Sequence, residues 1–175
     1  MAGKAWLVTH PETDMDKQGR VHGNLDPPLS HSGRIRAEQI GKSFRGKKIS
    51  KIHSSPRKRA LETAHAISKH TGANVEVHKD LEPWNLGSLS GAKTNSIRPV
   101  LDYFSKRPNR AIPGAESKGD VLTRYKRFSG KVKSGEVVVG HSQHSLAHDY
   151  VSKGGDASKV PMFGGKAGEI REVNV

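Results

Sequence analysis

Short runs of apolar residues alternate along the chain with longer segments in which apolar residues recur every three or four positions. The short runs predict buried strands, and the longer segments predict amphipathic helices. Strands are expected at residues 5–9, 51–53, 74–78, 136–140 and 169–173. This alternation is typical of an α/β protein, and we therefore expect a three-layer α/β/α sandwich in which helices flank a mostly parallel central sheet.

Helices are predicted between these strands, and polar or glycine residues mark several of their ends. Ser30 and Ser117 stand where they can cap helices, and Gly72 can end one. Residues 10–29 have no clear period and are expected to form a loop. Pro99 interrupts a segment of helical spacing at residues 94–106, and it must kink or split that helix.

The length of 175 residues suits one domain, and no repeat or linker divides residues 1–175. The chain has no cysteine, which excludes a disulfide framework, thiolate metal ligands and a cysteine nucleophile. No window approaches the roughly 18 apolar residues of a membrane span. We expect a soluble, cytoplasmic protein with no membrane partner, and the sequence leaves its oligomeric state open.

The balance of charge favours anionic ligands. Lys and Arg number 30 and Asp and Glu 17, so the formal net charge is +13. The densest basic stretch is residues 42–51. A solvated helix end explains that stretch as well as a nucleic-acid surface does, because aromatic residues for base stacking are sparse.

Polar residues follow three of the predicted strands. Thr9 and His10 end the first strand, Ser54 and Ser55 follow the second, and His141 follows the strand at residues 136–140. Ligands of open α/β sheets lie at the carboxyl ends of the strands, near helix N-termini that favour anions. A neutral imidazole can attack phosphorus, and a second histidine with an arginine can hold the charge of a phosphoryl group.

Six segments, in order along the chain, resemble the signatures of the histidine phosphatase superfamily, whose members are also called phosphoglycerate mutase-like. The segment at residues 54–64, with the sequence SSPRKRALETA, is the most specific match. The other matching segments are LVTHPET at residues 7–13, RVHGNLDPPLS at 20–30, LGSLSG at 86–91, PGAES at 113–117 and VVVGH at 137–141.

The resemblance implies a phosphatase that needs neither a metal nor another cofactor. His10 would attack phosphorus and carry the phosphoryl group as phosphohistidine, while Arg59 and His141 would bind it. Glu82 is the local candidate for the acid that protonates the leaving oxygen. The substrate would be a phosphorylated small molecule or a phosphoprotein.

Further contacts to the substrate are expected from residues in or next to the matched segments. These candidates are Thr9, Arg20, His22, Gly23 and Ser142.

The chain departs from the family pattern at the site itself. Thr9 replaces the arginine that precedes the nucleophile, and Pro11 replaces a glycine, which removes a backbone N–H. Pro83 stands where the family usually has its acid, one residue after Glu82. Asp16 replaces an asparagine of several members, and its charge would repel a phosphoryl group unless it points away.

These departures keep a second hypothesis open, that of a weakened or inactive member that binds a phosphorylated ligand or nucleic acid without turnover. A metal site is the less favoured interpretation of His141, His144 and His148. Their spacing would allow His144 and His148 to share a helix face, but no HExxH-type glutamate accompanies them.

Overall fold

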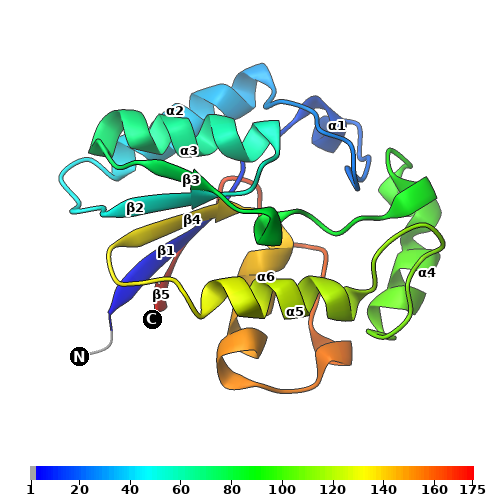
Figure 1. The fold of residues 1–175 in the computed structure, drawn as a ribbon. Coiled ribbons are helices and arrows are strands. Elements are labelled where there is room, and N and C mark those ends of the chain that lie inside the picture. Colours follow the sequence, from blue (N-terminus) through cyan, green and yellow to red (C-terminus); the bar gives the residue numbers. More distant parts are fainter. Residues whose placement is uncertain (1–2) are drawn as a thin grey trace.

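The computed structural model describes residues 3–175, and a five-stranded sheet forms its centre (Figure 1). The strands lie in the order β3-β2-β4-β1-β5, and all neighbouring pairs are parallel except β1 with β5. Their bounds are β1 Lys4–Thr9, β2 Lys51–Ser54, β3 Val75–Val77, β4 Glu136–Gly140 and β5 Ile170–Asn174. All five expected strands are therefore present, with ends shifted by one residue or less.

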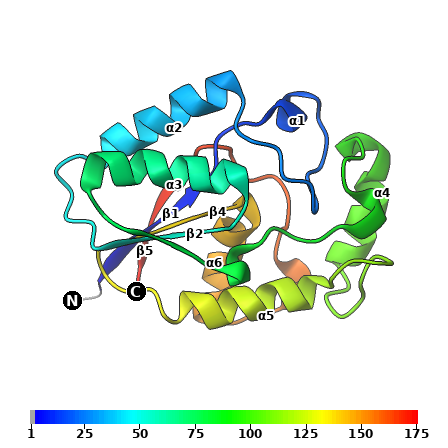
Figure 2. The same ribbon diagram turned by 45° about the horizontal axis from the view of Figure 1, so that its top comes forward.

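Helices cover both faces of the sheet, as the alternating pattern predicts (Figure 1). Helices α2 and α3 lie on one face and α5 and α6 on the other, whereas α1 and α4 lie beyond the carboxyl ends of the parallel strands (Figure 2). The helices are α1 Asp14–Lys17, α2 His31–Ser43, α3 Lys58–Thr71, α4 Thr94–Ser105, α5 Lys118–Ser129 and α6 Ser142–Lys153. The three-layer α/β/α prediction is confirmed.

Burial explains the position of each strand in the sheet. All five residues of β4 are buried, because this central strand is covered on both faces. The edge strand β3 has no buried residue. Strand β5 closes the other edge, and Gly3 and Val175 exchange two backbone hydrogen bonds there, which brings the two ends of the described chain together.

The predicted helix caps form. Ser30 Oγ accepts a hydrogen bond from Gly33 N, and Ser117 makes a capping box with Asp120 at the start of α5. Gly72 ends α3 at a φ of 74°, in the left-handed region that glycine adopts at low cost.

Helices α2 and α3 approach each other closely at Gly41. A Cβ atom at this position would lie 2.3 Å from the backbone oxygen of Ala66, so only glycine fits there. Beneath this contact, Ile40, Ile67 and Val137 belong to the apolar cluster between the helix pair and the sheet. The close approach therefore lets the helix pair bury its apolar stripe against the sheet.

One local prediction needs correction, and one of the two outcomes expected at Pro99, a kink or a split, is excluded. The segment 10–29 is not entirely a loop, because Thr13 and Asp16 form a capping box that starts the single-turn helix α1. Pro99 does not split α4, which runs through it as one helix. No helix among residues 3–175 is long and apolar enough to cross a membrane.

Candidate active site

A cleft of about 260 Å³ lies at the carboxyl ends of the parallel strands. It is where the sequence predicts the site, and eight of the nine candidate residues line it. These eight are Thr9, His10, Arg20, His22, Gly23, Arg59, His141 and Ser142. Residues from four separate segments of the chain thus meet around one space.

His10 follows β1 and is only 6% exposed. Its Nδ1 lies 2.7 Å from the backbone oxygen of Pro11. A carbonyl oxygen can only accept, so Nδ1 carries the proton of the neutral ring and Nε2 carries the lone pair. The residue that replaces the family's glycine therefore still supplies the carbonyl that sets the tautomer of His10.

Arg59, in the first turn of α3, joins the two histidines. The side chain is fully buried, and Nε donates to Nε2 of His10 at 3.2 Å. A terminal nitrogen lies 3.5 Å from Nδ1 of His141, and the other terminal nitrogen lies 3.9 Å from a carboxylate oxygen of Asp26. Burial lowers the pKa of Arg59 to about 10, which still leaves the guanidinium charged at neutral pH.

His141 follows β4 and faces His10, with ring centroids 5.2 Å apart. Because the guanidinium of Arg59 can only donate, Nδ1 of His141 accepts, and its Nε2–H donates to Ser55 Oγ at 2.9 Å. Ser55, which follows β2, thereby orients a histidine from a neighbouring strand.

Both histidines are neutral at physiological pH. Burial, reinforced by the charge of Arg59, lowers the pKa of His10 to about 3. The same two causes hold the pKa of His141 well below its ordinary value. A neutral imidazole with an unprotonated Nε2 is the nucleophilic form of histidine, and in this structure Arg59 donates a hydrogen bond to that nitrogen.

Asp16 lines the cleft and does not point away from it. The backbone N and Oγ1 of Thr13 each donate to its Oδ2 at 2.8 Å, and Nε2 of His22 lies 3.5 Å from the same oxygen. Burial opposes ionisation of Asp16, but hydrogen bonds from His22 and Thr13 outweigh it and hold the pKa of this carboxyl well below its usual range. Nε2 of His22 lies closer to Oγ1 of Thr13, at 2.8 Å, so the ionised Asp16 and Thr13 together position His22.

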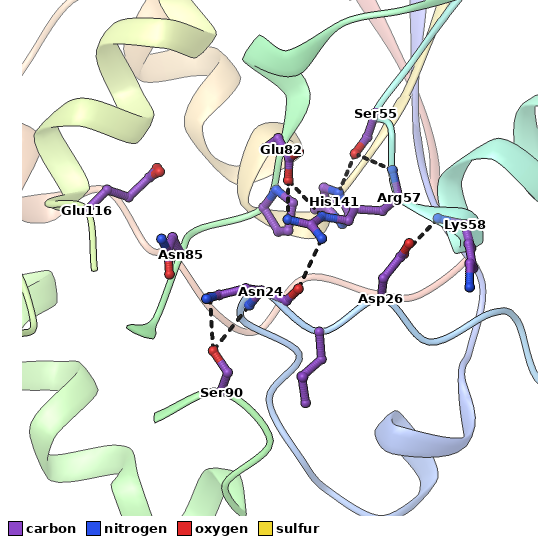
Figure 3. A network of polar contacts seen from close by, with 12 residues as sticks. Asn24, Asp26, Ser55, Arg57, Lys58, Glu82, Asn85, Ser90, Glu116 and His141 are labelled. Atoms are coloured by element: carbon purple, nitrogen blue, oxygen red, sulfur yellow. Dashed lines mark hydrogen bonds and ion pairs between the residues drawn. The ribbon is translucent and has the colours of Figure 1, made fainter. Parts of the chain in front are cut away.

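Glu82 is the one candidate that does not line the cleft. Its Oε2 accepts from Nε of Arg57 at 2.7 Å, and Arg57 also donates to the backbone oxygen of Asn24 at 3.0 Å (Figure 3). Pro83 lines the cleft in its place. In this arrangement Arg57 connects Glu82, in the loop after β3, with the loop that carries Asn24.

Sequence reasoning missed several residues of the cleft wall. Thr94 and Arg98 reach it from successive turns of α4, and Trp84 and Phe163 stack with ring centroids 5.8 Å apart. The four-residue spacing of Thr94 and Arg98 indicates a shared helix face, but nothing in the sequence shows where that face points. Only the packing of α4 beyond the strand ends directs it toward the cleft.

Among the described residues, His141, His144 and His148 do not converge on one possible metal position. The ring of His144 stacks on Tyr125 with centroids 4.9 Å apart, and Nδ1 of His148 lies 3.2 Å from the Tyr125 hydroxyl. Both rings therefore pack in the layer of α5 and α6.

The fold is a mostly parallel α/β/α sandwich, and two neutral histidines lie around a buried arginine at its strand ends. This arrangement is typical of α/β proteins that bind anions. Residues 5–145 match the model of the histidine phosphatase superfamily (branch 1), and the chain belongs to this family.

Individual relatives agree with this assignment. The chain is 29% identical over 136 residues to putative phosphoserine phosphatase 2 of Hydrogenobacter thermophilus, an alignment that covers 75% of this chain and 67% of the relative. It is 32% identical over 145 residues to phosphoglycerate mutase-like protein 4 of Arabidopsis thaliana, covering 76% and 63%. The chain thus spans about two thirds of the length of these relatives.

The fold also matches that of solved proteins. A mycobacterial glucosyl-3-phosphoglycerate phosphatase in complex with VO3 superposes with a TM-score of 0.85. The match covers 98% of this chain and 90% of that chain at 23% sequence identity. At this identity the likeness extends to the fold.

Proposed function

We propose that this protein is a metal-independent phosphatase that hydrolyses a phosphomonoester through a phosphohistidine on His10. One observation carries the proposal: the tautomer of His10 is set by Pro11, and its Nε2 lone pair faces Arg59 inside the cleft. Family membership and the phosphatase names of relatives support the same conclusion.

The phosphoryl group binds where the positive groups converge. Arg59 now donates to His10, and the oxygens of an incoming phosphoryl group replace His10 as the acceptor. Ser142, the first residue of α6, places the positive end of that helix at the same cleft. The hydroxyl of Thr9 and the side chains of Arg20 and His22 complete the wall.

The reaction proceeds in two displacements. Nε2 of His10 forms a bond to phosphorus as the ester oxygen leaves with the bonding electron pair. Water then attacks the phosphohistidine, which releases inorganic phosphate and restores the neutral ring. Arg59 and His141 stabilise the charge on the phosphoryl oxygens during both steps.

Protonation of the leaving oxygen is the weak part of this site. Asp16, which lines the cleft, is held ionised, and Glu82 is engaged with Arg57. A proton-donor role for Glu82 requires that ion pair to open. We therefore infer that the enzyme acts best on phosphates whose leaving group needs little protonation.

The cleft suits a phosphorylated small molecule. Its volume of about 260 Å³ is slightly below the roughly 300–1,000 Å³ typical of ligand pockets. Trp84 and Phe163 offer an apolar wall, and the exposed Arg98 adds a positive charge beside the phosphoryl site. A small organic phosphate with a second anionic or planar group fits these features better than an extended phosphoprotein segment.

The test is covalent labelling. Incubation with a ³²P-labelled aryl phosphate, followed by rapid quenching in alkali, should give one acid-labile phosphate on His10, and His10→Ala should abolish both label and turnover. Vanadate should inhibit in competition with substrate.

The alternative function makes a different prediction. If phosphate or vanadate binds but no label or turnover is found across a broad substrate panel, the protein is an inactive member that retains the anion pocket. If nucleic acid binds instead, its affinity must fall steeply with salt because counterions are released.

A further inference from the structure

A second histidine cluster lies outside the cleft, at the edge of the sheet formed by β2 and β3. His53 of β2, Glu76 of β3 and His78 just after β3 each present one ligand atom, and these atoms all lie within 4.8 Å of one another. None of the three lines the cleft. The proposed phosphatase reaction therefore does not account for this arrangement.

The spacing of the ligand atoms is close to that of a metal site. Nδ1 of His53 lies 2.9 Å from Nε2 of His78, and that nitrogen lies 3.2 Å from Oε1 of Glu76. Zinc bonds of about 2.0–2.1 Å in a tetrahedron place neighbouring ligands about 3.3 Å apart. The two shorter separations thus differ from this spacing by about 0.4 Å and 0.1 Å, and the third is no more than 4.8 Å.

Carboxylate and ammonium groups outside the cluster orient its members. Nε2–H of His53 donates to Oε2 of Glu136 at 2.9 Å, which leaves the Nδ1 lone pair pointing at the other two ligands. This carboxylate–histidine pairing is the usual support of a metal-bound imidazole. Lys51 binds Oε2 of Glu76 at 2.8 Å, so Oε1 is the oxygen that faces His78.

In the metal-free protein the ring of His78 is neutral and the carboxyl group of Glu76 is ionised. Burial, together with the neighbouring His53, lowers the pKa of His78, so its ring is neutral at pH 7. The hydrogen bond from Lys51 lowers the pKa of Glu76, which is ionised. Because Nδ1 of His53 accepts, Nε2 of His78 carries the proton in the metal-free protein, and this proton must move to Nδ1 of the same ring before Nε2 can bind the ion.

We propose that His53, Glu76 and His78 bind one divalent transition-metal ion of the zinc type, with water as the fourth ligand. Two imidazoles and one carboxylate are ligands that Zn²⁺ prefers over Mg²⁺ or Ca²⁺. The ion would tie the short, exposed edge strand β3 to the buried strand β2. Its role is to stabilise this edge, and it takes no part in the chemistry at His10.

The experiment is calorimetric titration of the metal-free protein with ZnCl2, together with Co²⁺ absorption spectroscopy. We expect one ion per chain, a Co²⁺ spectrum of low coordination number, and a rise in Tm on binding. His78→Ala and Glu76→Gln, which change partly exposed side chains, should each weaken binding at least tenfold. Glu136→Gln should weaken it 10- to 100-fold by releasing the ring of His53.

Two control variants separate this site from other histidines. His65→Ala removes an exposed histidine of α3 and should leave binding unchanged. His10→Ala removes the central ring of the cleft and should also leave binding unchanged. The proposal is wrong if Zn²⁺ fails to bind stoichiometrically, if His78→Ala binds as well as the parent protein, or if His10→Ala abolishes binding. The phosphatase proposal survives each of these results, because its test is the label on His10.

Discussion

Arg59 donates its Nε–H to Nε2 of His10 at 3.2 Å, in a position where neither side chain is more than 6% exposed. The same nitrogen of His10 is the one whose lone pair is left free by the Pro11 carbonyl. One contact therefore lowers the proton affinity of the ring and holds it toward Arg59, which in the proposed reaction binds a phosphoryl oxygen.

Two substitutions of Arg59 separate the effect of its charge from the effect of its hydrogen-bonding geometry. Arg59→Met should raise the pKa of His10 above about 3, though not to 6.5, because burial is the larger cause of the shift. Arg59→Lys should keep that pKa nearly unchanged. Both variants should lower kcat/KM by about 10²- to 10³-fold through loss of an oriented donor. NMR titration of the His10 ring and steady-state kinetics measure the two effects, and an unchanged pKa in Arg59→Met would contradict this account.

The engaged state of Glu82 predicts a strong dependence on the leaving group. An aryl phosphate should turn over about 10²-fold or more faster than an alkyl phosphate, since an effective general acid contributes about 10²- to 10⁴-fold. Glu82→Gln should change both rates by the same factor. A selective loss of the alkyl phosphate rate in this variant would instead show that Glu82 leaves Arg57 and donates the proton.

Acidification should destabilise the protein well before carboxylates titrate. Burial lowers the pKa of His10 and of His144 to about 3 and that of His141 well below 6.5. Between pH 6.5 and about 3 the unfolded chain therefore binds more protons than the folded one, and stability falls as pH falls through this window. Each histidine contributes a slope of about 1.4 kcal/mol per pH unit. Urea unfolding at pH 7, 6, 5 and 4.5 measures it.

His144→Leu supplies the control for this pH dependence. The variant removes one titrating ring that lies outside the cleft. The slope of the free energy of unfolding against pH should therefore fall by about 1.4 kcal/mol per pH unit, the contribution of one histidine. A slope that is the same in both proteins would show that His144 is not buried as a neutral ring.

The close contact of α2 and α3 predicts the effect of one methyl group. Gly41→Ala should lower the free energy of unfolding by about 1–3 kcal/mol, because its Cβ would overlap the backbone oxygen of Ala66. Lys42→Ala, at an exposed neighbouring position, should change it by less than about 0.5 kcal/mol. Chemical denaturation compares the two, and equal effects would argue against this packing.

Arg98 should affect substrate binding rather than chemistry. Arg98→Ala should raise KM for a substrate with a second anionic group about tenfold and leave kcat within twofold, because the side chain lies at the rim of the cleft. Arg34→Ala, on α2, is the matched control and should change neither constant. A fall in kcat alone would place Arg98 at the phosphoryl group itself.

Most of the fold that the sequence predicts follows from signals within a few neighbouring residues. Three consecutive valines in β4 indicate burial on both faces, and Ser30, Gly72 and Ser117 mark helix ends through contacts within a few residues. The α1 turn was missed because the helix that Thr13 caps has only four residues, too few for a period to show.

The sequence alone determined the strand ends at His10 and His141, the family signature around Arg59 and the position of the cleft. These features depend on short motifs and on the alternation of strands and helices. The tertiary structure decided what long-range contacts control. It directed Arg98 into the cleft, paired Glu82 with Arg57, and kept Asp16 ionised beside His22. Side-chain direction and protonation depend on neighbours that are distant in the chain, and no local pattern encodes them.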